Sequence, residues 1–377
     1  MLLNYHDVKS LLWILKYFTI SFACWNNHDK TDSHIRFLYI CLLCYYSFAC
    51  ACITHNSIHN RTFVNNVIEK VYLLILSISY GHPSLSLIPG HNIGHHKKTE
   101  TRQDAMRTSK MRYKWNFLNL FLFHPTVAVS VFKVDVRYLS LQRLMGKTYY
   151  TEICMQWVFL VVIQMILIYL NWKKFVLYVY IPHLFAQYWI VTMNILQHTG
   201  CEKETIQSTP NSRNYNTARN FTGYTINFLT FNNGYHTIHH MFPTMHWSRL
   251  SEEHNIRIKP YIHPNLIQTN IIIYIFKSFI YPGIQVDYLG NKVVFDISEK
   301  DDIDLDWTLE HASENIQFSD YDVDISGPAI LKQMSNFSLP KNKIDQKVKT
   351  FRGKQIFKRF LRKVTKSRQH LSITDKK

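Results

Sequence analysis

Apolar residues in this 377-residue chain gather in long runs instead of being spread in amphipathic patterns. Such runs are typical of helices that lipid surrounds. We expect membrane-spanning helices at about residues 11–25, 37–54, 153–170 and 175–196. The last two runs are each long enough to cross a hydrocarbon core of ~30 Å at ~1.5 Å per residue, and a short turn at residues 171–174 joins them.

Three further apolar runs contain residues that interrupt a helix or a span. Glycines and prolines break the run at 71–89, which we expect to lie in the membrane interface or to dip in and return. Pro125 divides the run at 115–131, and Lys277 interrupts the run at 271–279. We expect none of these three runs to span the membrane.

The last part of the chain changes in character. Residues 296–324 are rich in Asp and Glu, residues 341–377 are rich in Lys and Arg, and both hold few apolar residues. We therefore predict a membrane domain over residues 1–288 and a mostly disordered tail over residues 289–377. Residues 354–364 have the apolar spacing of a helix that would lie on a membrane surface, and a solvated charged tail fits them equally well.

The chain carries a formal net charge of +17, which raises nucleic acid and anionic membrane surfaces as candidate partners. Many of its Lys and Arg residues lie beside the apolar runs, above all at residues 97–114. This placement is typical of the positive-inside rule and of contact with anionic lipid headgroups. We therefore expect a membrane, and no nucleic acid, as the partner of these charges.

Nine histidines form the most informative polar pattern in the chain. They occur as an HxxxH, an HxxxHH, a single residue and an HxxHH: His55 and His59; His91, His95 and His96; His198; and His236, His239 and His240. Imidazole binds first-row transition metals, and residues three or four apart on a helix share a face, where their nitrogens can converge. The pattern therefore predicts a metal enzyme.

If these histidines bind metals at one site, all of them must lie at the same face of the membrane. The chain must then cross an even number of times between His96 and His198, and the last two predicted spans provide two crossings. By this argument both termini lie on the histidine side, as does a helical cap formed by residues 55–150 and 197–288. The cations of residues 97–147 indicate that this side is cytoplasmic.

The residues around the third histidine box are the most specific stretch of the sequence. They read NNGYHTIHHMFP at residues 232–243, followed by HWSRL at residues 246–250. Together with the other boxes, this stretch resembles the membrane fatty acid desaturase family over about residues 10–282. The resemblance implies an all-α integral membrane protein with four transmembrane helices and a cytoplasmic helical cap that carries a di-iron site. It also implies that the nine histidines are ligands of two irons and that Asn194 reaches an iron through water.

The second histidine box departs from the spacing that is commonest in acyl desaturases. Three residues instead of two separate its first two histidines, which places His96 ~140° from His91 on an ideal α-helix. A bend or a helix start is therefore required here, and Gly94 would permit it. Ligating imidazoles also need partners for their second nitrogen, and the nearby candidates are Asp104, Glu100, Asn220 and Asn233.

A shell of neutral imidazoles places little negative charge on the metals, so the oxidised site should be strongly electrophilic. This suits the removal of hydrogen from an unactivated C–H bond, with dioxygen as co-substrate. We therefore expect an oxygen-dependent fatty acid (acyl lipid) desaturase, an oxidoreductase of lipid metabolism. The alternative is a hydroxylase or ketolase on an alkyl, sphingoid or carotenoid-like substrate, since the spacing of the second box occurs in both classes. A histidine-lined metal transporter is disfavoured, because transporter sites lie near the bilayer midplane.

Reduction of dioxygen also needs an electron donor. The chain contains no His-Pro-Gly-Gly haem motif, no cysteine-rich ferredoxin pattern and no GxGxxG motif. We therefore expect a separate small electron-transfer protein of the ferredoxin or cytochrome b5 type. An acidic partner would suit the basic cytoplasmic surface, where neutralising Lys110, Arg112 and Lys114 together should slow reduction of the irons.

The other histidines have less specific surroundings. His183 lies about four helical turns before His198, so we expect it to bond to a neighbouring side chain instead of a metal. We assign a structural role to His246. We expect seven others, in polar or terminal segments, to face solvent: His6, His28, His34, His254, His263, His311 and His370.

Overall fold

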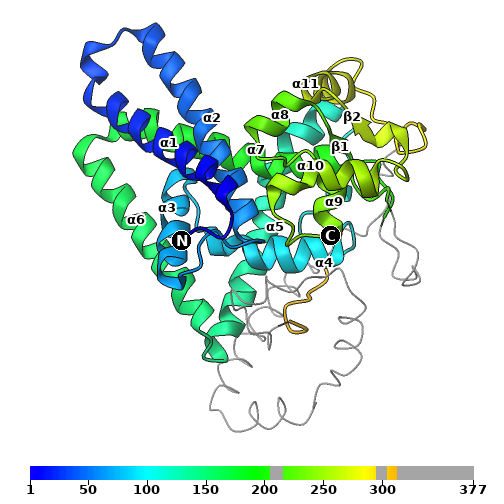
Figure 1. Ribbon diagram of the computed structural model, residues 1–377, viewed down its shortest axis with the longest axis horizontal. Helices are drawn as coiled ribbons and strands as arrows, with labels where there is room; N and C mark the ends of the chain where they lie inside the picture. The colour runs from blue at the N-terminus through cyan, green and yellow to red at the C-terminus, as the bar shows by residue number, and fades with distance from the viewer. Residues whose placement is uncertain (204–214, 294–303, 312–377) are drawn as a thin grey trace, which may run out of the picture. The chain divides into compact units, whose positions relative to one another are not determined.

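The computed structural model describes residues 1–203, 215–293 and 304–311, and these residues are mostly helical (Figure 1). The α-helices are α1 (Val8–Asn26), α2 (Ser33–Ser57), α3 (Asn66–Tyr80), α4 (His96–Lys98), α5 (Asn116–Leu144), α6 (Thr148–Phe175), α7 (Ile181–His198), α8 (Tyr224–Leu229), α9 (His236–Met241), α10 (Leu250–Glu253) and α11 (Ile271–Ile275). Four π-helical segments are η4 (Ile88–His95), η6 (Val176–Tyr180), η8 (His254–Ile258) and η10 (Phe276–Ile280). Six 3-10 segments are η1 (Tyr5–Asp7), η2 (His28–Lys30), η3 (Ser84–Ser86), η5 (Thr108–Lys110), η7 (Trp247–Arg249) and η9 (Pro264–Leu266). Two short strands, β1 (Asn220–Phe221) and β2 (Ile267–Gln268), pair in parallel.

Three helical segments of the described chain are long and apolar enough to cross a membrane: α2, α5 and Thr148–His198, which joins α6 to α7. Asn171 breaks this last segment with φ −168° and ψ 100°, within the turn expected between the third and fourth predicted spans. The helix pair Asn66–Tyr80 and Ser84–Lys98 makes a fourth candidate if it counts as one span. These three to four apolar helices are consistent with a multi-pass membrane protein.

The bent pair covers the apolar run at 71–89, and its two halves meet at 87°. The bend begins at Gly81, which ends α3 with φ +79° and donates its backbone N–H to the carbonyl of Ser77. Residues with a side chain rarely adopt this φ, so glycine suits the end of the helix. A broken span and a re-entrant loop both fit the bend, and the run does not form one straight helix.

Two expectations about spans differ from the structure. The run at 115–131 does not end at Pro125, because this proline lies inside the continuous helix α5, which is long and apolar enough to span. Proline removes one hydrogen bond from a helix, but membrane helices tolerate the loss where neighbouring groups satisfy the backbone. Conversely, α1, which covers the predicted span at 11–25, is not among the candidate spans and carries Lys9 and Lys16.

Helix α2 packs against α1, α3 and α7, and Figure 1 shows α1 beside α2. Most side chains in the second half of α2 are buried. Small residues such as Ala51 of α2 and Ala186 of α7 permit close packing, and Tyr80 of α3 lies in the same cluster. Because His55 lies in the last turn of α2, this packing brings the first histidine box into the interior.

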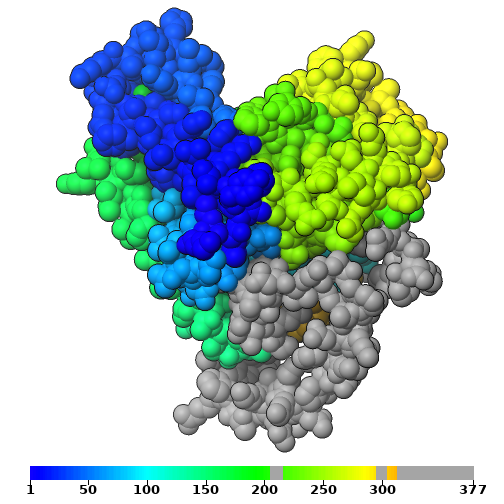
Figure 2. Space-filling model, viewed as in Figure 1, coloured from blue at the N-terminus to red at the C-terminus, as the bar shows by residue number. Residues whose placement is uncertain are grey.

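The N-terminal residues contact the segment that follows α7. The indole nitrogen of Trp247 donates to Asp7 at 2.9 Å, and Nε2 of His246 lies 3.2 Å from the same carboxylate. The Nζ atom of Lys9 donates to the backbone oxygen of Phe228 at 2.5 Å. Figure 2 shows this contact as dark-blue surface against yellow-green surface. The third-box region is thereby tied to α1.

Part of the predicted disordered tail is placed by the structure. Residues 304–311 pack against the segment that follows the second histidine box, and Trp307 is only 1% exposed. Asp304 and Glu310 pair with basic side chains of that segment, and Asp306 pairs with Arg137 of α5, a complementarity that the tail's composition does not reveal. Residues 294–303 and 312–377, with the helical pattern at 354–364, lie outside the described residues.

Candidate metal centre

All nine histidines singled out in the sequence come together in two groups. The first contains His55, His59, His91, His96 and His239. The second contains His95, His198, His236 and His240. Within each group, one ligand atom from every residue lies within 4.8 Å of all the others. Each group therefore has the donors and the spacing to hold one metal ion.

The two groups draw their side chains from separate parts of the chain. Helix α2 supplies His55, the loop after it supplies His59, and the second box lies on η4 and at the start of α4. Helix α7 ends at His198, and α9 carries the third box. The second and third boxes each contribute to both groups, so the two candidate metal positions are neighbours.

Close contacts between ring nitrogens mark each group. In the first, Nε2 of His96 lies 3.1 Å from Nε2 of His91 and 3.1 Å from Nε2 of His239. In the second, Nε2 of His236 lies 2.9 Å from Nε2 of His198 and 3.1 Å from Nε2 of His240. Adjacent ligands around a metal with ~2.1 Å bonds to nitrogen lie ~3.0 Å apart, so these distances fit a shared metal.

Unpartnered nitrogens support the same interpretation. Among the described residues, Nε2 of His59 and Nε2 of His95 are buried without a hydrogen-bond partner. A buried polar atom without a partner costs free energy, and native structures rarely keep one without a reason. A metal ion at each group would satisfy these nitrogens.

Hydrogen bonds to the opposite ring edge set the protonation of two histidines. Nδ1 of His95 lies 2.9 Å from the Asp104 carboxylate, and Nδ1 of His198 lies 3.0 Å from the backbone oxygen of Thr217. Both partners only accept, so each Nδ1 carries the hydrogen. The Nε2 lone pairs are then free to point into the second group, as metal-binding histidines require.

A π-helix explains how the second box brings its rings together. Backbone hydrogen bonds in η4 span five residues instead of four, and the N–H of His96 donates to the carbonyl of His91. This wider turn accommodates the extra residue between the histidines. The irregularity expected here is thus present: η4 ends at His95, α4 begins at His96, and Gly94 lies inside the π-helix.

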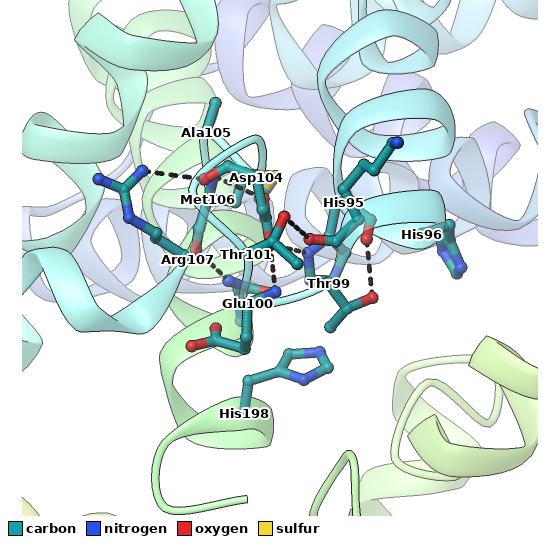
Figure 3. A network of polar contacts seen from close by, with 12 residues as sticks. His95, His96, Thr99, Glu100, Thr101, Asp104, Ala105, Met106, Arg107 and His198 are labelled. Carbon is teal, nitrogen blue, oxygen red and sulfur yellow. Dashed lines mark hydrogen bonds and ion pairs between the residues drawn. The ribbon is translucent and has the colours of Figure 1, made fainter. Parts of the chain in front are cut away.

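The loop after the second box holds Asp104 in place (Figure 3). The backbone N–H groups of Glu100 and Met106 donate to the Asp104 carboxylate at 3.1 and 2.7 Å. The side chains of His95 and Asp104 are both 0% exposed. A buried carboxylate with three donors has a fixed position, so it fixes the orientation of the His95 ring.

The other proposed partners of the ligands have different roles. The Glu100 carboxylate accepts from the backbone N–H and the hydroxyl of Thr108 and makes no hydrogen bond to a histidine of the two groups in the described part of the chain. The side chain of Asn220 bonds to the N–H and the hydroxyl of Thr237, beside His236 on α9. The backbone oxygen of Asn233 accepts from Gln197. Of the four candidates, Asp104 contacts a histidine of the groups directly.

Burial keeps the imidazoles outside the candidate spans neutral. It is the largest cause that lowers the pKa values of His59, His236, His239 and His240 well below 6.5, and neighbouring histidines lower them further. A neutral imidazole has the lone pair that a metal needs. These four imidazoles therefore need not lose a proton to bind a metal at neutral pH.

Asn194 lies one turn before His198 on α7 and is buried. Its side-chain nitrogen donates to the backbone oxygen of Met106 at 2.6 Å. This bond ties α7 to the loop that carries Asp104. The contact of Asn194 with a metal through water stays a prediction.

Of the seven histidines expected to face solvent, His6 and His34 are exposed, whereas His28, His263 and His311 are half-buried and His370 lies outside the described residues. Nε2 of His183 lies 2.9 Å from the hydroxyl of Tyr17, and His246 contacts Asp7, so both have the structural roles expected. His254 was expected to face solvent, but it is 1% exposed and packs against Tyr235. Its polar neighbours in the sequence gave no sign that η8 would turn this ring toward the third box.

Comparison with known proteins agrees with this geometry. The family profile described as fatty acid desaturase matches residues 33–270, which is more than half of the chain. The match contains all nine histidines, Asn194 and Asp104 and ends before residues 304–311. No curated protein sequence gives a significant match. On the family match, the chain belongs to the fatty acid desaturase family.

Proposed function

We propose that this protein is an oxygen-dependent desaturase of acyl lipids that uses two irons. The observation that carries the proposal is the sorting of nine histidines from separate helices into a group of five and a group of four. The family match supports an oxidoreductase of this kind. We further propose that His55, His59, His91, His96 and His239 hold one iron, that His95, His198, His236 and His240 hold the other, and that Asn194 acts through water.

The reaction removes two hydrogens from neighbouring methylenes of an acyl chain. When bound, the irons would supply the redox chemistry that couples this removal to the reduction of dioxygen. The two substrate hydrogens, two electrons from a donor and two protons convert one dioxygen to two waters and leave a carbon–carbon double bond. The balance therefore needs an external donor of two electrons.

The chain's own residues orient the imidazole ligands and exclude water from the site. Asp104 and the carbonyl of Thr217 hold two rings in the orientation that directs Nε2 into the second group. Burial of most of these histidines limits the access of bulk water to the groups, which favours a controlled reaction over leakage of oxidising species. The role of these residues is preorganisation of the site.

The position of the histidines along their helices supports a site at the membrane surface. His55 lies in the last turn of α2, and His198 is the last residue of α7. Ligands at helix ends argue against a transporter, whose site would lie near the middle of the spans. We propose that this surface is cytoplasmic, because many cations lie in residues 97–147, directly after the second histidine box.

The proposed electron donor is a small acidic protein of the ferredoxin or cytochrome b5 type. The exposure of the basic residues bears on the surface that such a donor would contact. Lys110 has a side chain only 7% exposed and pairs with Asp304 at 2.9 Å, so it is poorly placed for docking. Lys114 is exposed and lies beside the exposed Tyr113 and Trp115. We therefore propose Lys114 as the member of the predicted trio that contacts a donor.

Fatty-acid profiling in a host of simple lipid composition tests the proposed function. Cells that express the wild type should contain a new double bond, and His239→Ala should abolish it, because the first group loses one of its five proposed ligands. His34→Ala is the matched control, since His34 lies on α2 but is exposed. A new hydroxyl or keto group without a double bond would replace the proposal by a hydroxylase or ketolase.

A further inference from the structure

Residues 304–311 form a short ordered segment beyond the part of the chain that matches the family. Figure 1 draws it in orange. It carries three acidic residues within seven positions, yet Trp307 at its centre is 1% exposed and Thr308 is also 1% exposed. Burial of a tryptophan in such a charged segment indicates that the segment packs at a specific place on the protein. We call this segment the clamp.

Trp307 packs on the second histidine box. A Cβ atom placed on Gly94 would lie 3.3 Å from Nε1 of Trp307, so the indole covers this glycine between His91 and His95. The indole also lies 5.9 Å from the Tyr138 ring of α5, measured between ring centroids. Trp307 therefore fills the space between η4 and α5.

Ion pairs hold both ends of the clamp. Asp304 pairs with Arg107 and, at 2.9 Å, with Lys110, while Glu310 lies 3.6 Å from Lys98. Burial alone would raise the pKa of the Asp304 carboxyl, but the hydrogen bonds from Arg107 and Lys110 hold the pKa below 3.8. The backbone N–H of Leu305 also donates to the carbonyl of Arg102 at 2.9 Å. Every one of these partners follows the second box directly.

The contacts continue from the clamp to a proposed ligand. Arg107, which pairs with Asp304, also donates to the backbone oxygen of Asp104 at 3.3 Å. Asp104 in turn accepts from Nδ1 of His95. The clamp thus reaches the second group of histidines by two routes, one through Gly94 and one through Asp104.

We propose that the clamp holds the second histidine box in the geometry that binds metal, and that Trp307 is its main positioning residue. The metal part of this inference rests on the proposed function, whereas the contact of the clamp with residues 91–107 does not. The desaturase-like domain of this chain would then be incomplete without a segment that its composition marks as tail.

The test compares three substitutions in the full-length protein in detergent: Trp307→Ala, Trp307→Phe and Leu309→Ala. Leu309 is the matched control, because it lies in the clamp but is 70% exposed. Amide hydrogen exchange in residues 91–107 should be about tenfold faster in Trp307→Ala, and a chelator should extract iron about tenfold faster, since partners behind metal ligands typically change affinity by 10–100-fold. Trp307→Phe should have rates of amide exchange and iron extraction close to those of the wild type.

A spectroscopic readout separates positioning from general destabilisation. With Co²⁺ in place of iron, the visible bands of the metal should shift in Trp307→Ala and not in Leu309→Ala, because a change in ligand geometry changes these bands. The proposed role of the clamp would be overturned if Trp307→Ala had the wild-type rates of amide exchange and iron extraction and the wild-type visible bands. If the wild type bound no metal, the proposed function would fail. The exchange measurement would still show whether the clamp holds residues 91–107 in place.

A second variant covers the case in which Trp307→Ala does not fold. Asp304→Asn removes the charge that pairs with Arg107 and Lys110 and leaves the buried indole intact. In the wild type, high salt should speed exchange in residues 91–107, because it screens these pairs. Asp304→Asn should exchange faster at low salt and respond less to added salt; the same salt response as wild type would contradict the inference.

Discussion

Asp104 is the carboxylate on which the second group of histidines most directly depends. It is fully buried, accepts from two backbone N–H groups and receives the Nδ1–H of His95. A carboxylate behind a ligating imidazole fixes its tautomer and raises its basicity. The effect of Asp104 on a metal is therefore exerted entirely through the His95 ring.

Asp104→Asn should weaken metal binding about 10–100-fold while the protein still folds, because the amide keeps the size of the side chain but loses its charge. Metal titration of the purified protein in detergent measures this change. Asp29→Asn is the control, since the Asp29 side chain is 83% exposed. Metal affinity equal to that of the wild type would refute the role given to Asp104.

Glu100 should make stability depend on pH. Burial, with the nearby Asp104 carboxylate, raises the pKa of Glu100 from 4.5 to about 7, against the hydrogen bonds from Thr108. The folded protein thus holds this proton more tightly than the unfolded chain, so the stabilisation is complete below pH 4.5 and is lost as the pH rises through about 7.

The side chain of Glu100→Gln is neutral at every pH, so this variant should not lose stability as the pH rises through about 7. Relative to wild type, its free energy of unfolding should increase by up to about 3 kcal/mol as the pH rises from about 5 to about 8. Thermal unfolding in detergent at several pH values gives the comparison, with the exposed Glu252→Gln as control. A wild-type–variant difference that stays constant with pH would count against the raised pKa.

The π-helix η4 needs close contact with α5 as well as its own hydrogen bonds. A Cβ atom on Gly90 would lie 2.9 Å from Cγ1 of Val131, a separation that real side chains do not show. Gly90 directly precedes His91 of the second box. The absence of a side chain at this position therefore lets α5 support the element that carries His91 and His95 and leads directly into His96.

Gly90→Ala should destabilise the protein by about 1–3 kcal/mol, because the added methyl group forces η4 and α5 apart. The double variant Gly90→Ala with Val131→Ala should recover much of this loss, since it removes the atom that the methyl group would meet. Thermal unfolding in detergent of the two variants and of Val131→Ala alone provides the test. Failure of the second substitution to rescue the first would show that the contact is not the cause.

Across the molecule, the candidate metal centre connects segments that are far apart in the chain. Helices α2, α7 and α9 and the η4–α4 segment all end or begin at it. The N-terminal contact of Asp7 with Trp247 and the clamp join further segments to the same region. Metal bound there would link these segments in the folded state and not in the unfolded one.

Removal of metal should therefore lower the thermal stability of the whole protein. A ligand that binds the folded state at 100 times its dissociation constant stabilises it by ~2.7 kcal/mol. Chelation should lower the midpoint of thermal unfolding in detergent, and added Fe²⁺ should restore it. His239→Ala should respond less to both treatments. Identical midpoints with and without metal would argue against binding at these histidines.

Local pattern in the sequence was sufficient for several features. The runs at 37–54, 153–170 and 175–196 lie within helices of the structure, and the turn between the last two contains the break at Asn171. The three histidine boxes and the need for an irregular second box also followed from spacing, whereas the single His198 was assigned as a ligand by the resemblance to the family. These features depend on residues that are close in the chain, and the periodicity and hydrophobicity of such residues can be read from the sequence.

Only the tertiary structure divided the nine histidines into five and four, chose Asp104 over Glu100 as the partner of His95, and placed Trp307 on Gly94. Only the tertiary structure also showed that α5 continues past Pro125 and that His254 is buried. Each of these outcomes depends on contacts between residues distant in sequence, and local periodicity holds no information about which distant surfaces meet. Packing and charge pairing between those surfaces decided them.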